Sequence, residues 1–245
     1  MAGVAEPRGA TPLVSPPRRR AAAPVPLTLD SRRTNSGPLR ILCLGAHADD
    51  IEIGCGGTIL TLLAARRNIE CHWVVFSGGG GPREREARKS ADLFLARAKR
   101  RQVAVHGFRD GFFPYVGGEI KDTFEALARE VSPDVVFTHT RDDRHQDHRL
   151  VSDLTWNTFR SHLILEYEVP KYDGDLGVPN LFVPLGAAVA RAKIRHLRAA
   201  FGSQRRKRWF TADTFHALLR LRGVESGAPE GLAEAFYTRK ALLSF

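Results

Sequence analysis

From Arg40 onward, short apolar runs alternate with longer segments in which apolar residues recur every three or four positions. The short runs are rich in β-branched and aromatic residues and are typical of buried strands, whereas the longer segments are typical of amphipathic helices. The predicted strands cover residues 39–44, 71–77, 102–108, 134–140 and 164–169. The predicted helices cover residues 58–67, 83–100, 123–132 and 148–163.

This alternation of strand and helix predicts an α/β fold, with a Rossmann-like, mostly parallel sheet that carries helices on both faces. A loop rich in glycine and proline follows Pro170, and two further helical patterns lie near 189–201 and 214–221. We expect these patterns to form a C-terminal helical cap on the same domain. The domain is therefore predicted to span residues 40–245.

The first 39 residues are rich in proline, alanine and arginine and show no helical or strand periodicity. They are predicted to be a disordered basic leader, and the absence of an apolar stretch after Arg18–Arg20 argues against a secretory signal. The nearest alternative is a weak organelle-type transit peptide. No apolar run approaches the roughly 18 residues that a membrane span needs. The three isolated cysteines are expected to be small buried hydrophobic residues in a reducing compartment. Together these features favour a cytoplasmic protein.

Two clusters of polar residues follow predicted strands directly. His47, Asp49 and Asp50 come after the first strand, and the segment 139–148, with sequence HTRDDRHQDH, comes after the fourth. Ligands of open parallel sheets bind beyond the carboxyl ends of the strands. We therefore expect the two clusters to meet at one edge of the sheet.

The two clusters offer the mixture of imidazole and carboxylate ligands that suits zinc and related divalent metals. A catalytic zinc site needs three protein ligands and one open position. His47 and Asp50 are three residues apart and can turn toward one ion, and either His145 or His148 completes the set; the spacing leaves that choice open. Asp49 is then the candidate base that takes a proton from the attacking water. The remaining histidine, as a protonated imidazole, is expected to stabilise the oxyanion.

The alternative interpretation is structural. His47 and Asp50 would cap the following helix, and the second cluster would be a polar first turn in which Asp147 favours the helix N-terminus. Each cluster alone fits this interpretation as well as it fits a metal site. Their joint occurrence at the ends of two strands favours the metal site.

The motifs AHADD followed by GCGG, and HQDH about a hundred residues later, resemble the two signatures of the PIG-L/LmbE-like metal-dependent N-deacetylases. Enzymes of this family remove acetyl groups from amino sugars. The resemblance runs from about Arg40 to the C-terminus and excludes the leader. The family usually has proline where this chain has Ala48, a change that loosens a turn and alters no ligand.

Carried over by position, the resemblance implies that His47, Asp50 and His148 hold Zn²⁺ or another divalent metal. It also implies that Asp49 is the general base and His145 the second catalytic group. Whether Asp49 or His145 protonates the departing amine stays open. The implied partner is a small N-acetylated amino sugar, free or attached to a carrier.

Two further residues are candidates for substrate binding. The family places an arginine, with a glutamate three residues later, at the start of the helix after the second strand, and Arg83 with Glu86 matches this pattern. Arg83 is expected to contact a substrate oxygen, unless it belongs only to an exposed charged helix start. Asp110 is expected to accept hydrogen bonds from sugar hydroxyls, unless it is only a turn residue before Gly111.

The formal net charge is +10, and much of the charge outside the leader lies between Arg191 and Arg208. This segment holds eight basic residues and no acid, and it also has helical periodicity, so a solvated basic helix face is favoured over a nucleic-acid site. The rival hypothesis is a non-catalytic basic module that binds nucleic acid or anionic surfaces. A third hypothesis is a hydrolase of another amide on the same metal site. No specific nucleic-acid partner is expected, and the three tryptophans are expected to be packing residues.

Overall fold

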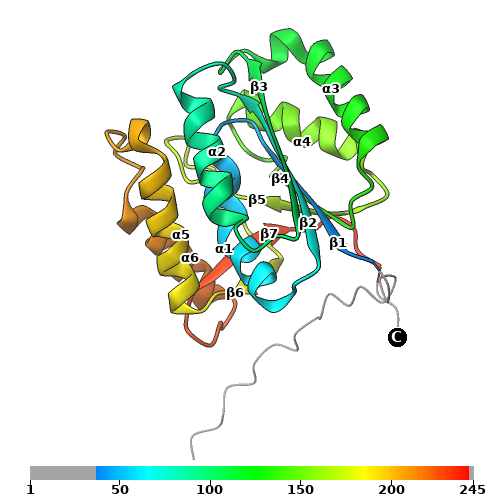
Figure 1. Ribbon diagram of the computed structural model, residues 1–245. Helices are drawn as coiled ribbons and strands as arrows, with labels where there is room; N and C mark the ends of the chain where they lie inside the picture. The colour runs from blue at the N-terminus through cyan, green and yellow to red at the C-terminus, as the bar shows by residue number, and fades with distance from the viewer. Residues whose placement is uncertain (1–36, 243–245) are drawn as a thin grey trace, which may run out of the picture.

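A seven-stranded sheet runs through the middle of the protein, with helices on both faces (Figure 1). This computed structural model describes residues 37–242, so the predicted leader lies outside the described residues except for positions 37–39. The strand order is β3-β2-β1-β4-β5-β7-β6; the first five strands in the chain are parallel, and β7 pairs antiparallel with both β5 and β6. The strands are β1 (Leu39–Gly45), β2 (Ile69–Ser77), β3 (Arg100–Phe108), β4 (Val135–His139), β5 (Leu163–Tyr167), β6 (Leu181–Pro184) and β7 (Ala233–Tyr237).

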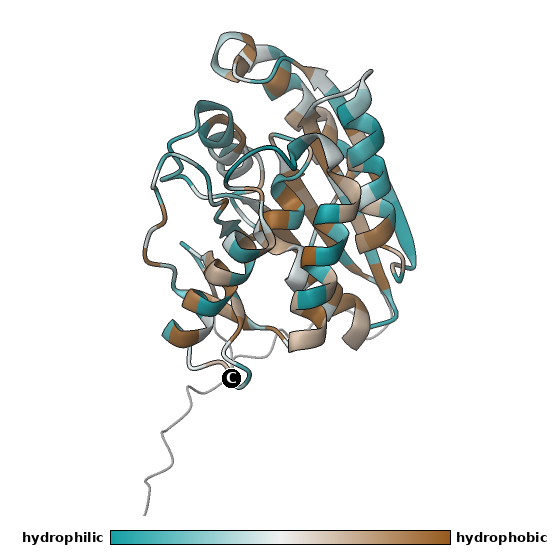
Figure 2. Cartoon of the chain, turned by 90° about the vertical axis from the view of Figure 1, so that its left-hand side faces the viewer, coloured by the Kyte–Doolittle hydropathy of each residue, from teal (hydrophilic) through white to brown (hydrophobic). Residues whose placement is uncertain are grey.

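The helices divide between the two faces of the sheet (Figure 1). They are α1 (Asp50–Ala65), α2 (Pro82–Phe94), α3 (Gly117–Glu130), α4 (Gln146–Thr158), α5 (Ala187–Ala200) and α6 (Ala212–Glu225), with short 3-10 turns η2 (Phe113–Val116) and η3 (Gly202–Gln204). One face is covered by α3 and α4, and the other by α1 and α2, with α5 packed against both of these and α6 beside α5. Hydrophilic residues lie mainly on the outer faces of the helices (Figure 2).

Residues of β1 alternate between the two layers of core, as the two-residue period of a strand requires. Ile41 and Cys43 pack in the core under α1 and α2, whereas Leu42 and Leu44 pack in the core under α3 and α4. A strand with both faces buried is a continuous apolar run in the sequence, and this run made β1 recognisable. The three cysteines are buried free thiols.

The predicted fold class is confirmed, but two strands were missed and several helix bounds are wrong. The third helix begins at Gly117 rather than at residue 123, and the fourth ends at Thr158 rather than at residue 163. Strands β6 and β7 were not expected, because each is short and lies in a segment dominated by loop and helix signals. The second helix ends at Phe94 rather than near residue 100, because β3 already begins at Arg100 beside Glu70 of β2. The first helix begins at Asp50, eight residues before its predicted start at Thr58.

The early start of α1 carries the GCGG motif into the helix, where glycine has a low intrinsic propensity. Packing explains these glycines. A Cβ atom on Gly54 would lie 2.1 Å from the Tyr167 ring, and one on Gly56 would lie 2.5 Å from the Phe94 ring. The glycines therefore let α1 lie directly against the sheet and α2, which fixes the position of the helix N-terminus that carries Asp50.

The C-terminal segment is tied to the middle of α1 by a buried ion pair. Glu234 of β7 accepts hydrogen bonds from the backbone N–H groups of Gly57 and Thr58 at 2.7 and 2.6 Å. Lys193 of α5 donates to Glu234 at 2.5 Å and to the carbonyl oxygen of Ile53 at 2.6 Å. The charge pattern of this segment had suggested a solvated basic helix face. Lys193 is not part of such a face, because it neutralises a buried carboxylate.

Within residues 37–242, none of the helices combines the length and the apolar composition that crossing a bilayer requires.

Replacing Gly54 with alanine is expected to destabilise the protein by about 1–3 kcal/mol, because the added methyl group overpacks a filled core. The Tyr167 ring has little freedom to move away, since its hydroxyl donates to the carbonyl oxygen of Leu44 at 2.6 Å. Gly118→Ala is the matched control, because Gly118 lies in the exposed first turn of α3 with no atom within 4 Å of an added Cβ. Urea denaturation measures both, and equal stability of the two variants would contradict this account of the glycine motif.

Candidate functional site

The two polar clusters meet between β1 and β4, where the order in which the chain adds strands to the sheet reverses. β1 and β4 are neighbours, but the chain leaves β1 toward β2 on one side and leaves β4 toward β5 on the other. The helices that follow therefore diverge, and a crevice opens beyond the ends of these two strands. The backbone N–H of Ala46 donates to Nε2 of His139 at 3.0 Å, which joins the two loops directly.

The three predicted metal ligands lie together in this crevice. Nδ1 of His47 is 3.1 Å from Nε2 of His148 and 3.3 Å from Oδ2 of Asp50, and the third side of the triangle, from His148 Nε2 to Asp50 Oδ2, is 3.4 Å. Zinc bonds of about 2.0–2.1 Å at tetrahedral angles place ligand atoms roughly 3.3 Å apart. The triangle therefore has the size that one tetrahedral ion requires.

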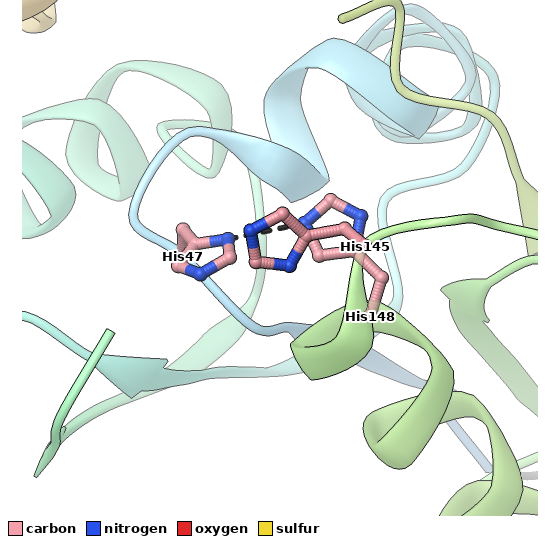
Figure 3. A group of neighbouring side chains, drawn as sticks. All are labelled: His47, His145 and His148. Carbon is pink, nitrogen blue, oxygen red and sulfur yellow. Dashed lines mark hydrogen bonds between the residues drawn. The ribbon is translucent and has the colours of Figure 1, made fainter. Parts of the chain in front are cut away.

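Figure 3 shows the imidazoles of His47 and His148 turned toward each other from the loop after β1 and from α4. The outer nitrogens of both rings contact carboxylates: His148 Nδ1 is 2.8 Å from Asp143 Oδ2, and His47 Nε2 is 3.1 Å from Asp110 Oδ1. In the neutral rings these outer nitrogens carry the protons, so two lone pairs face each other beside an anionic oxygen. Three acceptors that face one another repel unless a cation lies between them. These residues fit a divalent metal.

The electrostatics of the triangle follow from its burial. Burial by itself would raise the pKa of Asp50, but the imidazoles of His148, His139 and His47 lower it well below its usual value. Burial and the neighbouring His139 lower the pKa of His148 to about 4. Asp50 is therefore an anion and His148 a neutral imidazole near pH 7, which are the protonation states that bind metals.

His47 differs from His148. Burial opposes its protonation, yet the carboxylates of Asp50, Asp110 and Asp147 together raise the pKa of His47 well above the usual value. In the absence of a metal, His47 therefore carries a proton that satisfies the neighbouring acceptors. A metal at the triangle would displace the proton on the inner nitrogen, as metal binding at imidazoles generally does.

The carboxylate of Asp143 orients the second motif. Its Oδ2 contacts His148 Nδ1, and its Oδ1 accepts a hydrogen bond from the backbone N–H of His145 at 2.8 Å. Lys171 lies 3.0 Å from Oδ1 and neutralises this buried acid. Asp143 thus fixes both the ring of His148 and the start of α4, which is the usual role of a carboxylate behind a metal-bound histidine.

The predicted base, Asp49, lies beside the triangle and is 4% exposed. Its Oδ1 accepts a hydrogen bond from Nη2 of Arg83 at 2.7 Å, whereas its buried Oδ2 has no partner among the described residues. Burial raises the pKa of Asp49 above its usual value, although the charge of Arg83 acts in the opposite direction. One oxygen is therefore held in place, and the other has a free lone pair.

Arg83 lines the site, but its guanidinium is largely engaged by protein groups. Besides Asp49, it donates from Nη1 to Glu86 at 2.9 Å and to the hydroxyl of Ser203 at 3.2 Å. The sequence predicted neither the contact of Arg83 with Glu86 nor its contact with Asp49. Arg83 therefore links the candidate base to the segment that follows α5.

The second catalytic candidate, His145, is the N-cap of α4. Its Nδ1 accepts a hydrogen bond from the backbone N–H of Asp147 at 3.3 Å, so the neutral ring carries its proton on Nε2. Its ring lies 4.8 Å from that of His47 in an edge-on arrangement. Burial and the charge of His47 lower the pKa of His145, which favours a neutral imidazole over the protonated one expected from the sequence.

Asp110 lies at the mouth of the site with its side chain 75% exposed. Its Oδ1 contacts Nε2 of His47 at 3.1 Å, so it orients a predicted ligand and also lines the open side of the cavity. Asp147 makes the same contact at 3.2 Å and accepts hydrogen bonds from the backbone N–H groups of Gly111 and Phe113. The loop after β3 is thereby attached to the start of α4.

All seven predicted site residues line one cavity of about 260 Å³. Its remaining walls come from the loop after β5 and from the segment after α5, with Val169, Lys171, Tyr172, Asp173, Gln204, Lys207 and Trp209. Trp209, expected to be a packing residue, therefore has part of its surface in the cavity. A second, much smaller cavity of about 20 Å³ lies at Lys193 and Glu234, away from the triangle.

Sequence reasoning missed several residues of the site. His139 stacks on His148 with ring centroids 3.9 Å apart, and its Nε2 lies 3.2 Å from Asp50 Oδ2. Its position as the last residue of a buried strand was a usable signal. The roles of Asp143 and Lys171 had no comparable signal, because they depend on a contact between two loops.

Comparisons with known proteins agree with this geometry. The family model described as PIG-L, GlcNAc-PI de-N-acetylase, matches residues 42–159. The chain is 31% identical over 156 residues to the uncharacterized deacetylase YaiS of Escherichia coli K12, an alignment that covers 58% of this chain and 81% of YaiS.

Solved structures share the fold at low identity. The N,N'-diacetylchitobiose deacetylase from Pyrococcus horikoshii has a TM-score of 0.62 and 21% identity, over 86% of this chain and 87% of that one. GalB, the 4-carboxy-2-hydroxymuconate hydratase of Pseudomonas putida KT2440, has a TM-score of 0.66 and 16% identity, over 84% of this chain and 98% of that one. The fold is thus found in proteins with different activities, and the reaction has to be argued from the site.

Zinc added to the metal-free protein is expected to raise its melting temperature. At a free Zn²⁺ concentration 100-fold above Kd the stabilisation is about 2.7 kcal/mol, which corresponds to a rise of roughly 5–10 °C for a domain of this size. His148→Ala removes one corner of the triangle and is expected to abolish the rise. His216→Ala is the control, because His216 is exposed on α6. A full rise in His148→Ala, measured by calorimetry, would show that the metal binds elsewhere.

Proposed function

Because the chain belongs to the PIG-L family, we propose that it is a metal-dependent N-deacetylase that hydrolyses the acetamide of an amino sugar or an amino-sugar conjugate. The observation that carries the proposal is the triangle of His47, Asp50 and His148 with a buried, half-free carboxylate beside it in an open cavity. The overall reaction adds water across the amide bond and releases acetate and a free amine.

The proposed metal is Zn²⁺, because two imidazoles and one carboxylate form a ligand set typical of catalytic zinc. A bound divalent ion supplies Lewis-acid activation of water and of the amide carbonyl. The protein's part is to hold the ligands in the tautomers that direct their lone pairs inward. Asp143 does this for His148, and Asp110 and Asp147 do it for His47.

Asp49 is proposed to take the proton of the attacking water. Its Oδ1 is held by Arg83, which prevents rotation of the carboxylate, and Oδ2 faces no competing donor among the described residues. Its burial favours the protonated form, and this makes the carboxylate a stronger base than one in water. The proton taken by Oδ2 then stays within the cavity.

His145 is proposed to stabilise the negative charge that develops on the carbonyl oxygen. Its Nδ1 accepts from the α4 backbone, so its Nε2–H is the donor available to the substrate. The departing amine needs one proton, which comes from the protonated Asp49 or from His145.

Arg83 and Asp110 are proposed to bind the substrate. Arg83 holds Asp49 and lies within reach of a substrate oxygen, and Asp110 offers its exposed oxygen to sugar hydroxyls.

Two rival functions lead to different observations. A hydrolase of another amide would use the same metal and base, and only a substrate panel scored for released acetate separates it from the deacetylase. A non-catalytic basic module would bind polyanions without metal, with an affinity that falls steeply as salt rises. The buried triangle is not needed for that function, so we favour the enzyme. The expected cytoplasmic location stays a prediction.

Asp49→Asn is expected to keep about one metal ion per chain and to lower kcat by roughly 10²–10⁴-fold, the contribution typical of a general base. The asparagine retains an oxygen for Arg83, so the fold and the ligands should be undisturbed. Asp122→Asn, at an exposed position of α3, is the control for loss of one acidic charge. Metal analysis and acetate release are measured on the same samples, and full turnover by Asp49→Asn would disprove the assignment of the base.

His145→Ser is expected to lower kcat by about 10²–10³-fold with unchanged metal content, because it removes one donor to the oxyanion. Serine is a favourable N-cap, so the substitution preserves the start of α4 that an alanine would weaken. Thermal melting checks that the stability is retained. Loss of metal together with activity would instead identify His145 as a ligand.

A further inference from the structure

One wall of the cavity has no part in the chemistry described above. It is formed by the segment 203–209, which follows α5, and it contributes Gln204, Lys207 and Trp209 to the lining. The wall lines the same cavity as Asp49 and the three residues of the triangle. A substrate held for attack at the triangle therefore lies within range of this segment.

Lys207 differs from the other two cationic side chains of the cavity. Arg83 is paired with Asp49 and Glu86, and Lys171 with Asp143 and Asp175. Among residues 37–242, no carboxylate forms an ion pair with Lys207, and its ammonium lies over the Trp209 ring, 5.5 Å from the centroid. Of the three cationic side chains that line the cavity, Lys207 is thus the one without an ion pair among the described residues.

The residues around Lys207 add to the positive electrostatic potential of this wall. Arg205, Arg206 and Arg208 flank it, all with exposed side chains, and the segment 191–208 contains no acidic residue. Four consecutive cationic side chains, at positions 205–208, create a positive local potential. This wall therefore attracts anions to the mouth of the cavity, close to the reaction centre.

The backbone of the wall is held in place by several contacts. Ser203 donates from its N–H and its hydroxyl to Glu86 at 2.8 and 2.6 Å, and the N–H of Lys207 donates to the carbonyl oxygen of Gln204 at 2.9 Å. Trp209 packs edge-on against Phe210, whose ring lies 5.2 Å from that of Phe215 in the core. The indole is therefore anchored, with its remaining surface in the cavity.

We infer that this wall is a subsite for an anionic group of the substrate, a phosphate or a carboxylate, bound by Lys207 while the sugar ring packs against Trp209. The inference rests on the proposed deacetylase function and narrows its substrate class to N-acetylated amino sugars that carry a negative charge. An ammonium is a point charge with three donors and suits either anion. An indole offers a broad apolar surface to the C–H face of a sugar.

The test compares acetate release from N-acetylglucosamine, N-acetylglucosamine 1-phosphate and N-acetylmuramic acid. The wild-type protein is expected to have a higher kcat/KM for at least one of the charged sugars than for the neutral one. In Lys207→Met, the ratio of charged to neutral kcat/KM is expected to fall about tenfold, the loss typical of one hydrogen bond to a charged group. Lys207→Arg, which keeps the charge, should preserve most of the ratio.

Arg206→Met is the matched control, because it removes one adjacent positive charge that does not line the cavity. It is expected to leave the ratio unchanged, which separates a local contact from general attraction. An equal fall in both variants, or no fall in Lys207→Met, would overturn the subsite. The charged sugar whose ratio falls identifies the anion as phosphate or carboxylate.

Direct binding makes the test independent of turnover. Calorimetry with glucosamine 1-phosphate and muramic acid, which carry the two anions on a sugar ring, is expected to show weaker binding to Lys207→Met than to wild type, by about tenfold. If wild type and Lys207→Met bind each compound with equal affinity, the subsite is overturned, even if no acetylated sugar is hydrolysed. Release of acetate from the neutral sugar without any preference for charge would overturn the subsite and leave the proposed deacetylase function intact.

Discussion

The buried carboxylate of Asp50 contacts three imidazoles at the junction of β1 and β4, and the rest of the site is arranged around this contact. A charge this deeply buried is tolerated only when partners compensate for the lost hydration. Here the backbone N–H of His47 donates to Asp50 Oδ2 at 2.6 Å, and the protonated ring of His47 supplies the opposite charge. The imidazoles come from segments about a hundred residues apart, so the contact requires β1 and β4 to be neighbours in the sheet. The position of the proposed metal thus depends on the topology of the sheet.

Carboxylates form a second layer behind the imidazoles and determine what each ring does. Asp143 holds His148, and Asp110 and Asp147 hold His47, so in both rings the inner nitrogen is directed at Asp50. His139 acts differently, because its Nε2 accepts from the backbone of Ala46 and joins the two loops. Four histidines therefore lie together in three roles, with two as proposed ligands, His145 as the proposed donor to the oxyanion, and His139 as a structural link.

The two sides of the cavity come from different parts of the chain. All seven predicted site residues lie within the region 42–159 that matches the PIG-L family model. The wall with Lys207 and Trp209, and the loop with Lys171 and Tyr172, lie beyond it. Arg83 connects the two sides, because it contacts both Asp49 and Ser203. The proposed reaction centre and the proposed substrate-selecting surface are therefore separate in sequence and are joined by side-chain contacts, among them those of Ser203 with Arg83 and Glu86.

The sequence by itself determined the parallel part of the sheet, the edge at which the polar clusters meet, and two corners of the triangle, His47 and Asp50. These features were recognisable because buried parallel strands are continuous apolar runs and because ligands bind beyond their carboxyl ends. The choice of His148 over His145 for the third corner came from the resemblance to the PIG-L family. The start of α1 was missed, because the glycines of the GCGG motif argue against a helix until the rings of Tyr167 and Phe94 are known to lie against them. Only the tertiary structure decided that Lys193 is buried whereas Lys207 faces the cavity, although both belong to one basic run. The partners of a long flexible side chain are set by contacts between distant segments, and local sequence does not record those contacts.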